Sequence, residues 1–100
     1  MKHTSKKAQL IYSLTKVQIK PFIENYKRDI GEPNPMKMGV GLRYPDNMSI
    51  TMHTLKELQY LLDWDRQHRV IDQDVAVIMQ NTIDWAIKEE KEWQKMLKAL

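Results

Sequence analysis

Three side chains near the middle of the chain are of types that bind metal ions. Asp63, Asp65 and His68 offer two carboxylates and an imidazole over a short stretch. On a helix, Asp65 and His68 share a face at i, i+3, but Asp63 lies on another face. Asp65 also stands four residues before Arg69, which is the spacing of a helix ion pair. We therefore interpret the group as a solvated, salt-bridged face and predict no metal site.

The remaining inventory of catalytic groups is small. The chain has no cysteine, which excludes thiolate nucleophiles, thiolate metal sites and disulfides. It has no His-Glu-x-x-His motif, no Gly-Lys-Ser/Thr phosphate loop and no Gly-x-Ser-x-Gly elbow. Gly39-Val40-Gly41 lies inside an alternating apolar pattern, where glycine more often marks a bulge than a nucleotide site. We predict a protein that is not an enzyme, has no catalytic residues and needs no cofactor.

A second group of residues has the chemistry of nucleic-acid contact. Every second residue is apolar on both sides of Pro45-Asp46-Asn47, and this alternation predicts a β-hairpin at about residues 36–53. Its apolar face holds Met36, Met38, Val40, Leu42, Tyr44, Met48, Ile50 and Met52. Its polar face holds Lys37, Gly39, Gly41, Arg43, Asn47, Ser49, Thr51 and His53, with no acidic residue.

A two-stranded ribbon of this kind fits the major groove of DNA, where Arg and Asn side chains pair with base edges. The predicted base contacts are Lys37, Arg43, Asn47, Ser49 and Thr51. The alternative is that this face is only the solvated side of a sheet that is buried on its other side.

The charge distribution adds a second basic surface. The net charge is +3 and the pI about 9.2. Residues 1–32 carry seven Lys/Arg and three Asp/Glu, whereas residues 55–100 carry seven and nine. The positive potential should therefore lie on the first part of the chain. We predict phosphate contacts from Lys16, Lys20, Lys27 and Arg28.

The element that positions these cations is predicted to be a helix over residues 5–30. Leu10, Leu14 and Val17 follow helical spacing with Ile11 alongside, and Pro21 predicts a kink or a restart. The apolar stripe continues through Phe22, Ile23, Tyr26 and Ile30. Gly31 suits the C-terminal cap of this helix. An alternative makes residues 15–20 a short strand, because Val17 and Ile19 alternate with lysines.

Two further helices are predicted after the hairpin. Thr54-Leu55-Lys56-Glu57 has the pattern of a capping box, which starts a helix that reaches about His68. Asp72 is a plausible N-cap of the last helix, with Asp74 in its first turn. The fold class is therefore α+β and mostly helical: one domain over residues 1–100 with a kinked N-terminal helix, a hairpin and two helices.

The last helix is long for a domain of this size, at about 40 Å. A mostly apolar stripe with alternating spacings of four and three residues continues along it: Met79, Ile83, Ala86, Glu90, Trp93, Leu97 and Leu100. This pattern predicts a homodimer, with Met79, Ile83, Ala86, Trp93 and Leu97 in its interface.

Residues 47–87 resemble a ribbon-helix-helix DNA-binding domain. The resemblance rests on the alternating stretch at 47–53, the capped helix that follows from Thr54 and a further helix from about Asp72. It implies that Asn47, Ser49 and Thr51 read the DNA groove. It also implies that Val75, Met79 and Ile83 form a dimer core. The usual glycine between the two helices is missing, since His68-Arg69-Val70-Ile71 stands there.

The sequence favours a small, soluble, cytoplasmic regulator that binds DNA or RNA and does not contact a membrane. No apolar run has the ~18 residues of a membrane span, and the basic N-terminus is not followed by a signal-peptide core. The alternative is a protein–protein inhibitor or adaptor, such as a phage or mobile-element protein that blocks a host enzyme or defence complex. The abundance of Trp, Tyr and Met favours that second class.

Overall fold

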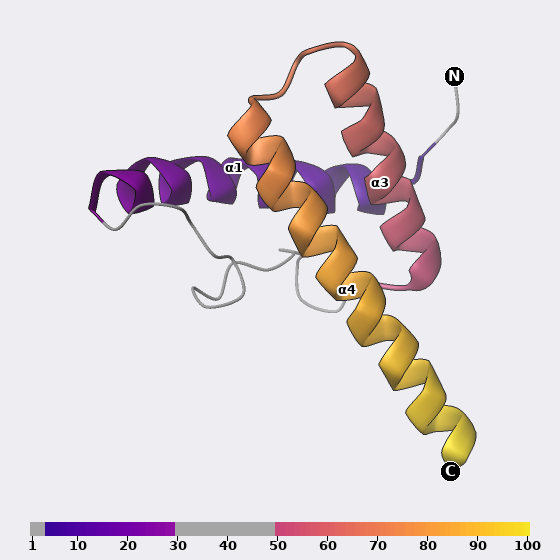
Figure 1. Ribbon diagram of the computed structural model, residues 1–100. Helices are drawn as coiled ribbons and strands as arrows, with labels where there is room; N and C mark the ends of the chain where they lie inside the picture. The colour runs from indigo at the N-terminus through magenta and orange to yellow at the C-terminus, as the bar shows by residue number, and fades with distance from the viewer. Residues whose placement is uncertain (1–3, 30–49) are drawn as a thin grey trace.

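Three helices that all contact one another form the part of the protein described by this computed structural model (Figure 1). The structure describes residues 4–29 and 50–100, and only the backbone of residues 26–29. Helix α1 spans Lys6–Asp29, α3 spans Met52–Gln67 and α4 spans Gln73–Ala99. Helices α3 and α4 form a hairpin of helices, and α1 crosses both of them.

The predicted α+β class is wrong, because every regular element in residues 4–29 and 50–100 is a helix. The second strand of the predicted hairpin was to run to His53, but Met52 and His53 form the first turn of α3. Ile50 and Met52 pack against the core from the start of a helix and not from a strand. Residues 36–49 of that prediction lie outside the described residues.

Helix α3 begins three residues earlier than the capping box at Thr54 predicts. Thr51 is the N-cap, and its side chain accepts a hydrogen bond from the Thr54 amide at 3.3 Å. Ile50 and Leu55 then occupy the N′ and N4 positions of a hydrophobic staple, and both belong to the core cluster. Thr51 therefore replaces the predicted Thr54 as the N-cap, and this start lets Ile50 and Leu55 both pack at the core.

Helix α1 continues through Pro21 without a restart, and the alternative strand at residues 15–20 is wrong because this stretch is helical. The buried face of α1 matches the predicted stripe only in part: Ile11 and Ile23 are buried, but Leu10 is 41% exposed and Val17 is 68% exposed. Pro21 is also exposed. The carbonyl that its ring leaves without a helical donor belongs to Val17, on the solvent side where water can bind it.

The opposite face of α1 supplies its contribution to the core. The buried residues on this face are Ala8, Ile11, Tyr12, Thr15, Ile19 and Ile23. Thr15 is also fully buried. Its hydroxyl donates to the Ile11 carbonyl at 2.8 Å, and this local hydrogen bond satisfies the polar group in the core.

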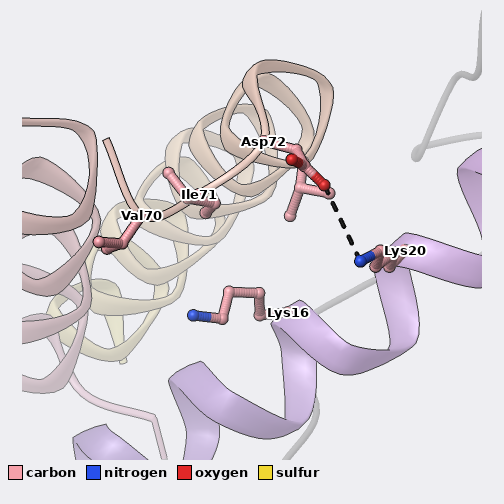
Figure 2. Close-up of a pocket in the computed structure, with 6 residues that line it drawn as sticks. Lys16, Lys20, Val70, Ile71 and Asp72 are labelled. Carbon is pink, nitrogen blue, oxygen red and sulfur yellow. Dashed lines mark ion pairs between the residues drawn. The ribbon is translucent and has the colours of Figure 1, made fainter. Parts of the chain in front are cut away.

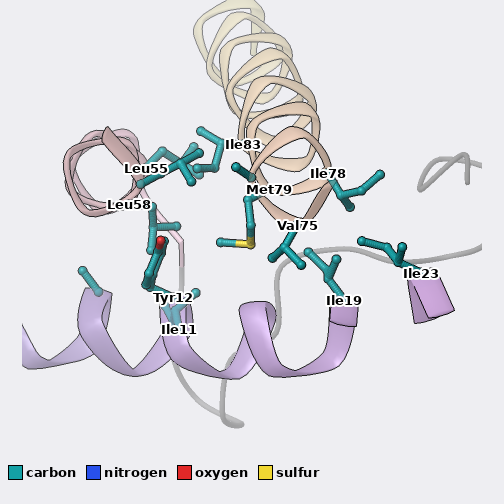
Figure 3. Packing of buried hydrophobic residues seen from close by; sticks show 13 residues of the cluster. Ile11, Tyr12, Ile19, Ile23, Leu55, Leu58, Val75, Ile78, Met79 and Ile83 are labelled. Carbon is teal, nitrogen blue, oxygen red and sulfur yellow. The ribbon is translucent and has the colours of Figure 1, made fainter. Parts of the chain in front are cut away.

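The core lies where the three helices meet (Figure 3). Leu58 of α3 and Met79 of α4 are fully buried, and Met79 points into the space between α1 and α3. The other buried apolar residues of these two helices are Leu55, Leu62, Val75, Ala76, Ile78 and Ile83. These residues follow helical spacing, so α3 and α4 each bury one continuous stripe.

The turn between α3 and α4 is closed by Arg69, a residue with a positive φ of 55°. The Arg69 amide donates to the Arg66 carbonyl at 3.2 Å, and the Val70 amide donates to the Asp65 carbonyl at 3.0 Å. These two bonds define a Schellman motif whose left-handed position usually holds glycine. The chain therefore makes the tight turn without the glycine that the ribbon-helix-helix pattern would place there.

Replacing Arg69 with glycine is expected to raise the free energy of unfolding by about 0.5–1 kcal/mol, because glycine adopts positive φ without a Cβ clash. Urea unfolding followed by circular dichroism measures the change. Gln67→Gly is the matched control: inside the last turn of α3 the same residue should cost about 1 kcal/mol. Equal destabilisation by both substitutions would contradict the role assigned to Arg69.

Candidate interaction surface

A buried carboxylate of α3 completes the N-terminus of α1. Ser5 is the residue before α1, and its hydroxyl accepts a hydrogen bond from the Ala8 amide at 3.1 Å. In a capping box, an acidic residue at the position of Ala8 would accept from the Ser5 amide. Here Glu57, which is only 4% exposed, accepts from both the amide and the hydroxyl of Ser5. His53 also lies against this carboxylate, with its Nε2 at 3.3 Å.

A second polar contact joins α1 to the end of α3. The Tyr12 hydroxyl donates to the Asp65 carboxylate at 2.6 Å, and Lys16 Nζ lies 3.3 Å from the same oxygen. Burial of the Tyr12 ring, together with its hydrogen bond to Asp65, raises the pKa of the phenol above its usual range. Tyr12 is therefore a neutral donor that orients Asp65, and Asp65 pairs with Lys16 on α1.

The three side chains weighed as metal ligands, Asp63, Asp65 and His68, all have structural partners. The Asp63 carboxylate accepts a hydrogen bond from the Gln59 side chain (Nε2) at 2.9 Å. The His68 ring stacks on Trp64 with ring centroids 3.7 Å apart, and its Nδ1 lies 2.8 Å from the Trp64 carbonyl. Within residues 4–29 and 50–100, no cluster of three or more His, Asp or Glu side chains is arranged to hold a metal ion.

An open pocket of about 220 Å³ lies between α1 and the turn that precedes α4 (Figure 2). It is lined by Lys16, Lys20, Val70, Ile71, Asp72 and Val75. Lys20 Nζ faces the Asp72 carboxylate at 4.0 Å. Lys16 Nζ lies 3.3 Å from Asp65. Each lysine thus already has a carboxylate beside it, so the pocket holds no excess of positive charge for an anionic ligand.

Only three of the residues predicted to contact nucleic acid have side chains in the described part of the chain, and they do not form one surface. Lys16 and Lys20 line the pocket, and Thr51 is the N-cap of α3. The side chains of Lys27 and Arg28, near the end of α1, lie outside the described part. So do Lys37, Arg43, Asn47 and Ser49. Nucleic-acid binding through these residues stays a prediction.

The residues predicted for a dimer interface divide into two groups. Met79 and Ile83 are fully buried in the core that α4 shares with α1 and α3, and Ala86 packs partly against it. Val75 is buried there as well. Trp93 and Leu97, in contrast, are 53% and 45% exposed. The same helical stripe therefore serves the intrachain core first and then emerges from it.

The stripe of α4 leaves the core because α4 is longer than α3, the helix with which it pairs. Helix α4 has 27 residues and α3 has 16, which correspond to about 40 Å and 24 Å. Residues 88–100 extend past the start of α3, and we name them the α4 overhang. Figure 1 shows this segment, in yellow, standing clear of the other helices, and every residue from 91 to 100 is exposed.

The α4 overhang carries large apolar side chains on the side that continues the core stripe. Met96 is 61% exposed, beside the half-exposed Trp93 and Leu97. Large aromatic and methionine side chains grouped on a surface mark interaction sites more often than isolated exposed residues do. The overhang is therefore the candidate interaction surface.

Comparisons with known proteins supply no further guide: no family model, curated protein or solved structure matches this chain. In the described residues, none of the helices combines the length and the apolar character needed to cross a membrane.

Proposed function

We propose that this protein is a non-catalytic interaction module that binds a helix of a partner along the α4 overhang. The single observation that carries the proposal is the exposure of Trp93, Met96 and Leu97 on a helix segment that extends beyond its neighbours. Burial of such side chains contributes about 25 cal/mol per Å² of apolar area removed from water.

A helix is the partner element that the shape of this surface favours. The stripe of α4 repeats at alternating spacings of four and three residues: Met79, Ile83, Ala86, Glu90, Trp93, Leu97, Leu100. We name this stripe the α4 seam. Seams of this period pack side by side with the seam of another helix, whereas a strand or a flat surface matches only part of it. Helix-in-groove and helix-on-helix recognition both use anchors at this spacing.

The electrostatics of the bundle also favour a protein partner over a polyanion. The overhang contains Glu89, Glu90 and Glu92 beside four lysines, so its charge is nearly balanced. Lys16 and Lys20, which were predicted to contact phosphates, lie beside Asp65 and Asp72. Nucleic-acid affinity arises mainly from uncompensated cations, and these two lysines are compensated.

The test uses a designed helical probe of three heptads, with leucine at the a and d positions, no tryptophan and a fluorescent label. Anisotropy should rise with a Kd on the order of 10 µM on titration with the wild-type protein. Trp93→Glu combined with Leu97→Glu should abolish the binding, because each change places a charge in the contact.

The control is Ala99→Glu, which adds one negative charge at a helical position off the α4 seam, where the double variant adds two on it. It should bind the probe within about threefold of the wild-type affinity, since a peripheral charge changes an exposed contact by well under 1 kcal/mol. Absence of probe binding by the wild type would refute the proposal, and so would equal binding by the double variant.

A further inference from the structure

We propose that the helix bound by the α4 overhang is the α4 overhang of a second copy of this chain, and that the two helices pair antiparallel. This inference rests on the proposed function, because it names the partner of the same surface. It is argued from the composition of the α4 seam and from the order of charges along the overhang.

The α4 seam is suited to a partner with the same pattern. Within the bundle it packs against the core, and Ala86 and Ile87 are the last residues of α4 that do so. Beyond that point the seam keeps its period, and Trp93 and Leu97 stay half exposed. A two-fold axis midway between Trp93 and Leu97 would place Trp93 of each copy against Leu97 of the other, which is how a self-complementary interface closes.

The net charge changes sign along the overhang. Residues 88–92 contain three glutamates and two lysines, for a net charge of −1, whereas residues 93–100 contain Lys95 and Lys98 and no acidic residue, for a net charge of +2. An antiparallel pair places the acidic segment of one copy alongside the basic segment of the other. A parallel pair places like segments side by side, which costs free energy at each level.

Glu90 gives a second reason for the antiparallel orientation. It is a member of the α4 seam and is partly buried, and its carboxylate accepts a hydrogen bond from the Gln94 side chain (Nε2) at 3.0 Å. In a parallel pair, equivalent seam positions meet at the same level, so two Glu90 carboxylates would face each other in a water-poor contact. In an antiparallel pair, Glu90 meets a different residue of the partner.

Sedimentation equilibrium of the full chain at 5–200 µM tests the association. We expect a monomer–dimer equilibrium with a Kd on the order of 10 µM, and Leu97→Glu should weaken it more than 30-fold. Ala99→Glu should change it less than threefold. At protein concentrations well below this Kd, where the chain is monomeric, far-UV circular dichroism and thermal unfolding of each variant should match the wild type, because the overhang is outside the core.

Charge-order variants test the orientation. Lys95→Glu with Lys98→Glu should weaken an antiparallel dimer about tenfold, since acidic segments then face acidic segments. Adding Glu89→Lys and Glu92→Lys to that variant restores the net charge of the wild type and reverses the order. The fourfold variant should recover the wild-type Kd within about threefold. A parallel dimer predicts instead little change in Kd for either variant, because like segments face each other in the wild type and in both variants.

The outcomes separate this inference from the proposed function. A chain that stays monomeric at 200 µM but binds the helical probe overturns self-pairing and leaves the helix-binding module in place. A chain that is monomeric and also fails to bind the probe overturns both. A dimer whose Kd is insensitive to Leu97→Glu places the contact elsewhere and overturns this inference.

Discussion

Replacing Ile11 with alanine is expected to lower the free energy of unfolding by about 2–5 kcal/mol. Ile11 is fully buried where α1 meets the other helices (Figure 3). The substitution removes its side-chain atoms from the core and leaves a cavity lined by neighbours that relax only in part. For a domain of about 100 residues each kcal/mol shifts Tm by about 4–8 °C. Thermal unfolding followed by circular dichroism measures the loss.

Val17→Ala on the same helix is the matched control for Ile11→Ala. Val17 is 68% exposed, so its truncation should change the unfolding free energy by no more than about 0.5 kcal/mol. The pair of substitutions compares the two apolar stripes of α1 directly. A larger loss for Val17→Ala than for Ile11→Ala would mean that the helix buries the stripe that periodicity alone selects.

Replacing Glu57 with alanine is expected to destabilise the protein by about 1–3 kcal/mol, although the side chain that it removes is charged and not apolar. The substitution leaves the Ser5 amide and hydroxyl without their acceptor at a partly buried helix end. Glu57→Gln keeps one acceptor oxygen and should lose roughly half as much. Glu89→Ala removes an exposed carboxylate and should stay within about 0.5 kcal/mol.

A double-mutant cycle with Ser5→Ala identifies the contact responsible. Ser5→Ala alone removes the N-cap of α1 and should cost about 0.5–2 kcal/mol. If Glu57 acts through Ser5, the combined variant loses less than the sum of the two, with a coupling energy of at least about 0.5 kcal/mol. Additive losses would show that Glu57 stabilises the bundle by a different route.

Much of the helical content could be predicted from the sequence. The spacing of Leu55, Leu58 and Leu62 predicted α3. Asp72 occupies the predicted N-cap position of α4, but its side chain makes no capping hydrogen bond. Asp74 lies in the first turn of α4 as expected. These features are local, because helical periodicity and cap preference act over only a few residues.

The helix faces of α1 could not be chosen from the sequence. Leu10, Leu14 and Val17 form one apolar stripe, and Ile11, Ile19 and Ile23 form another on the opposite side of the helix. Both have helical period, and only packing against α3 and α4 decides which is buried. Thr15 concealed the true stripe, because its burial depends on a hydrogen bond to the Ile11 carbonyl.

The predicted hairpin failed at Ile50 and Met52 for a physical reason. An apolar residue on each side of a threonine fits a strand, but it also fits a helix start in which the threonine is the N-cap. The cap at Thr51 satisfies the Thr54 amide while Ile50 and Met52 reach the core. The role of Glu57 was missed for a related reason: its partner Ser5 is 52 residues away in the chain.

The candidate surface was predicted only in part. The period of the α4 seam indicated a helix long enough to project, and Trp93 and Leu97 are exposed. Periodicity does not distinguish burial within one chain from burial between chains, so Met79 and Ile83 were assigned to the dimer although they lie in the intrachain core. The two groups are separated near Ala86, where α4 stops packing against the core, and that point depends on the tertiary structure.

The α4 overhang also gives the protein an anisometric outline, with principal extents of 46, 34 and 24 Å. Its radius of gyration is 14.3 Å, against about 13 Å for a compact domain of this length. An elongated particle diffuses more slowly than a sphere of equal mass, so its Stokes radius exceeds that of the sphere. An elution volume calibrated with globular standards therefore overstates the mass of a monomer of 11.9 kDa.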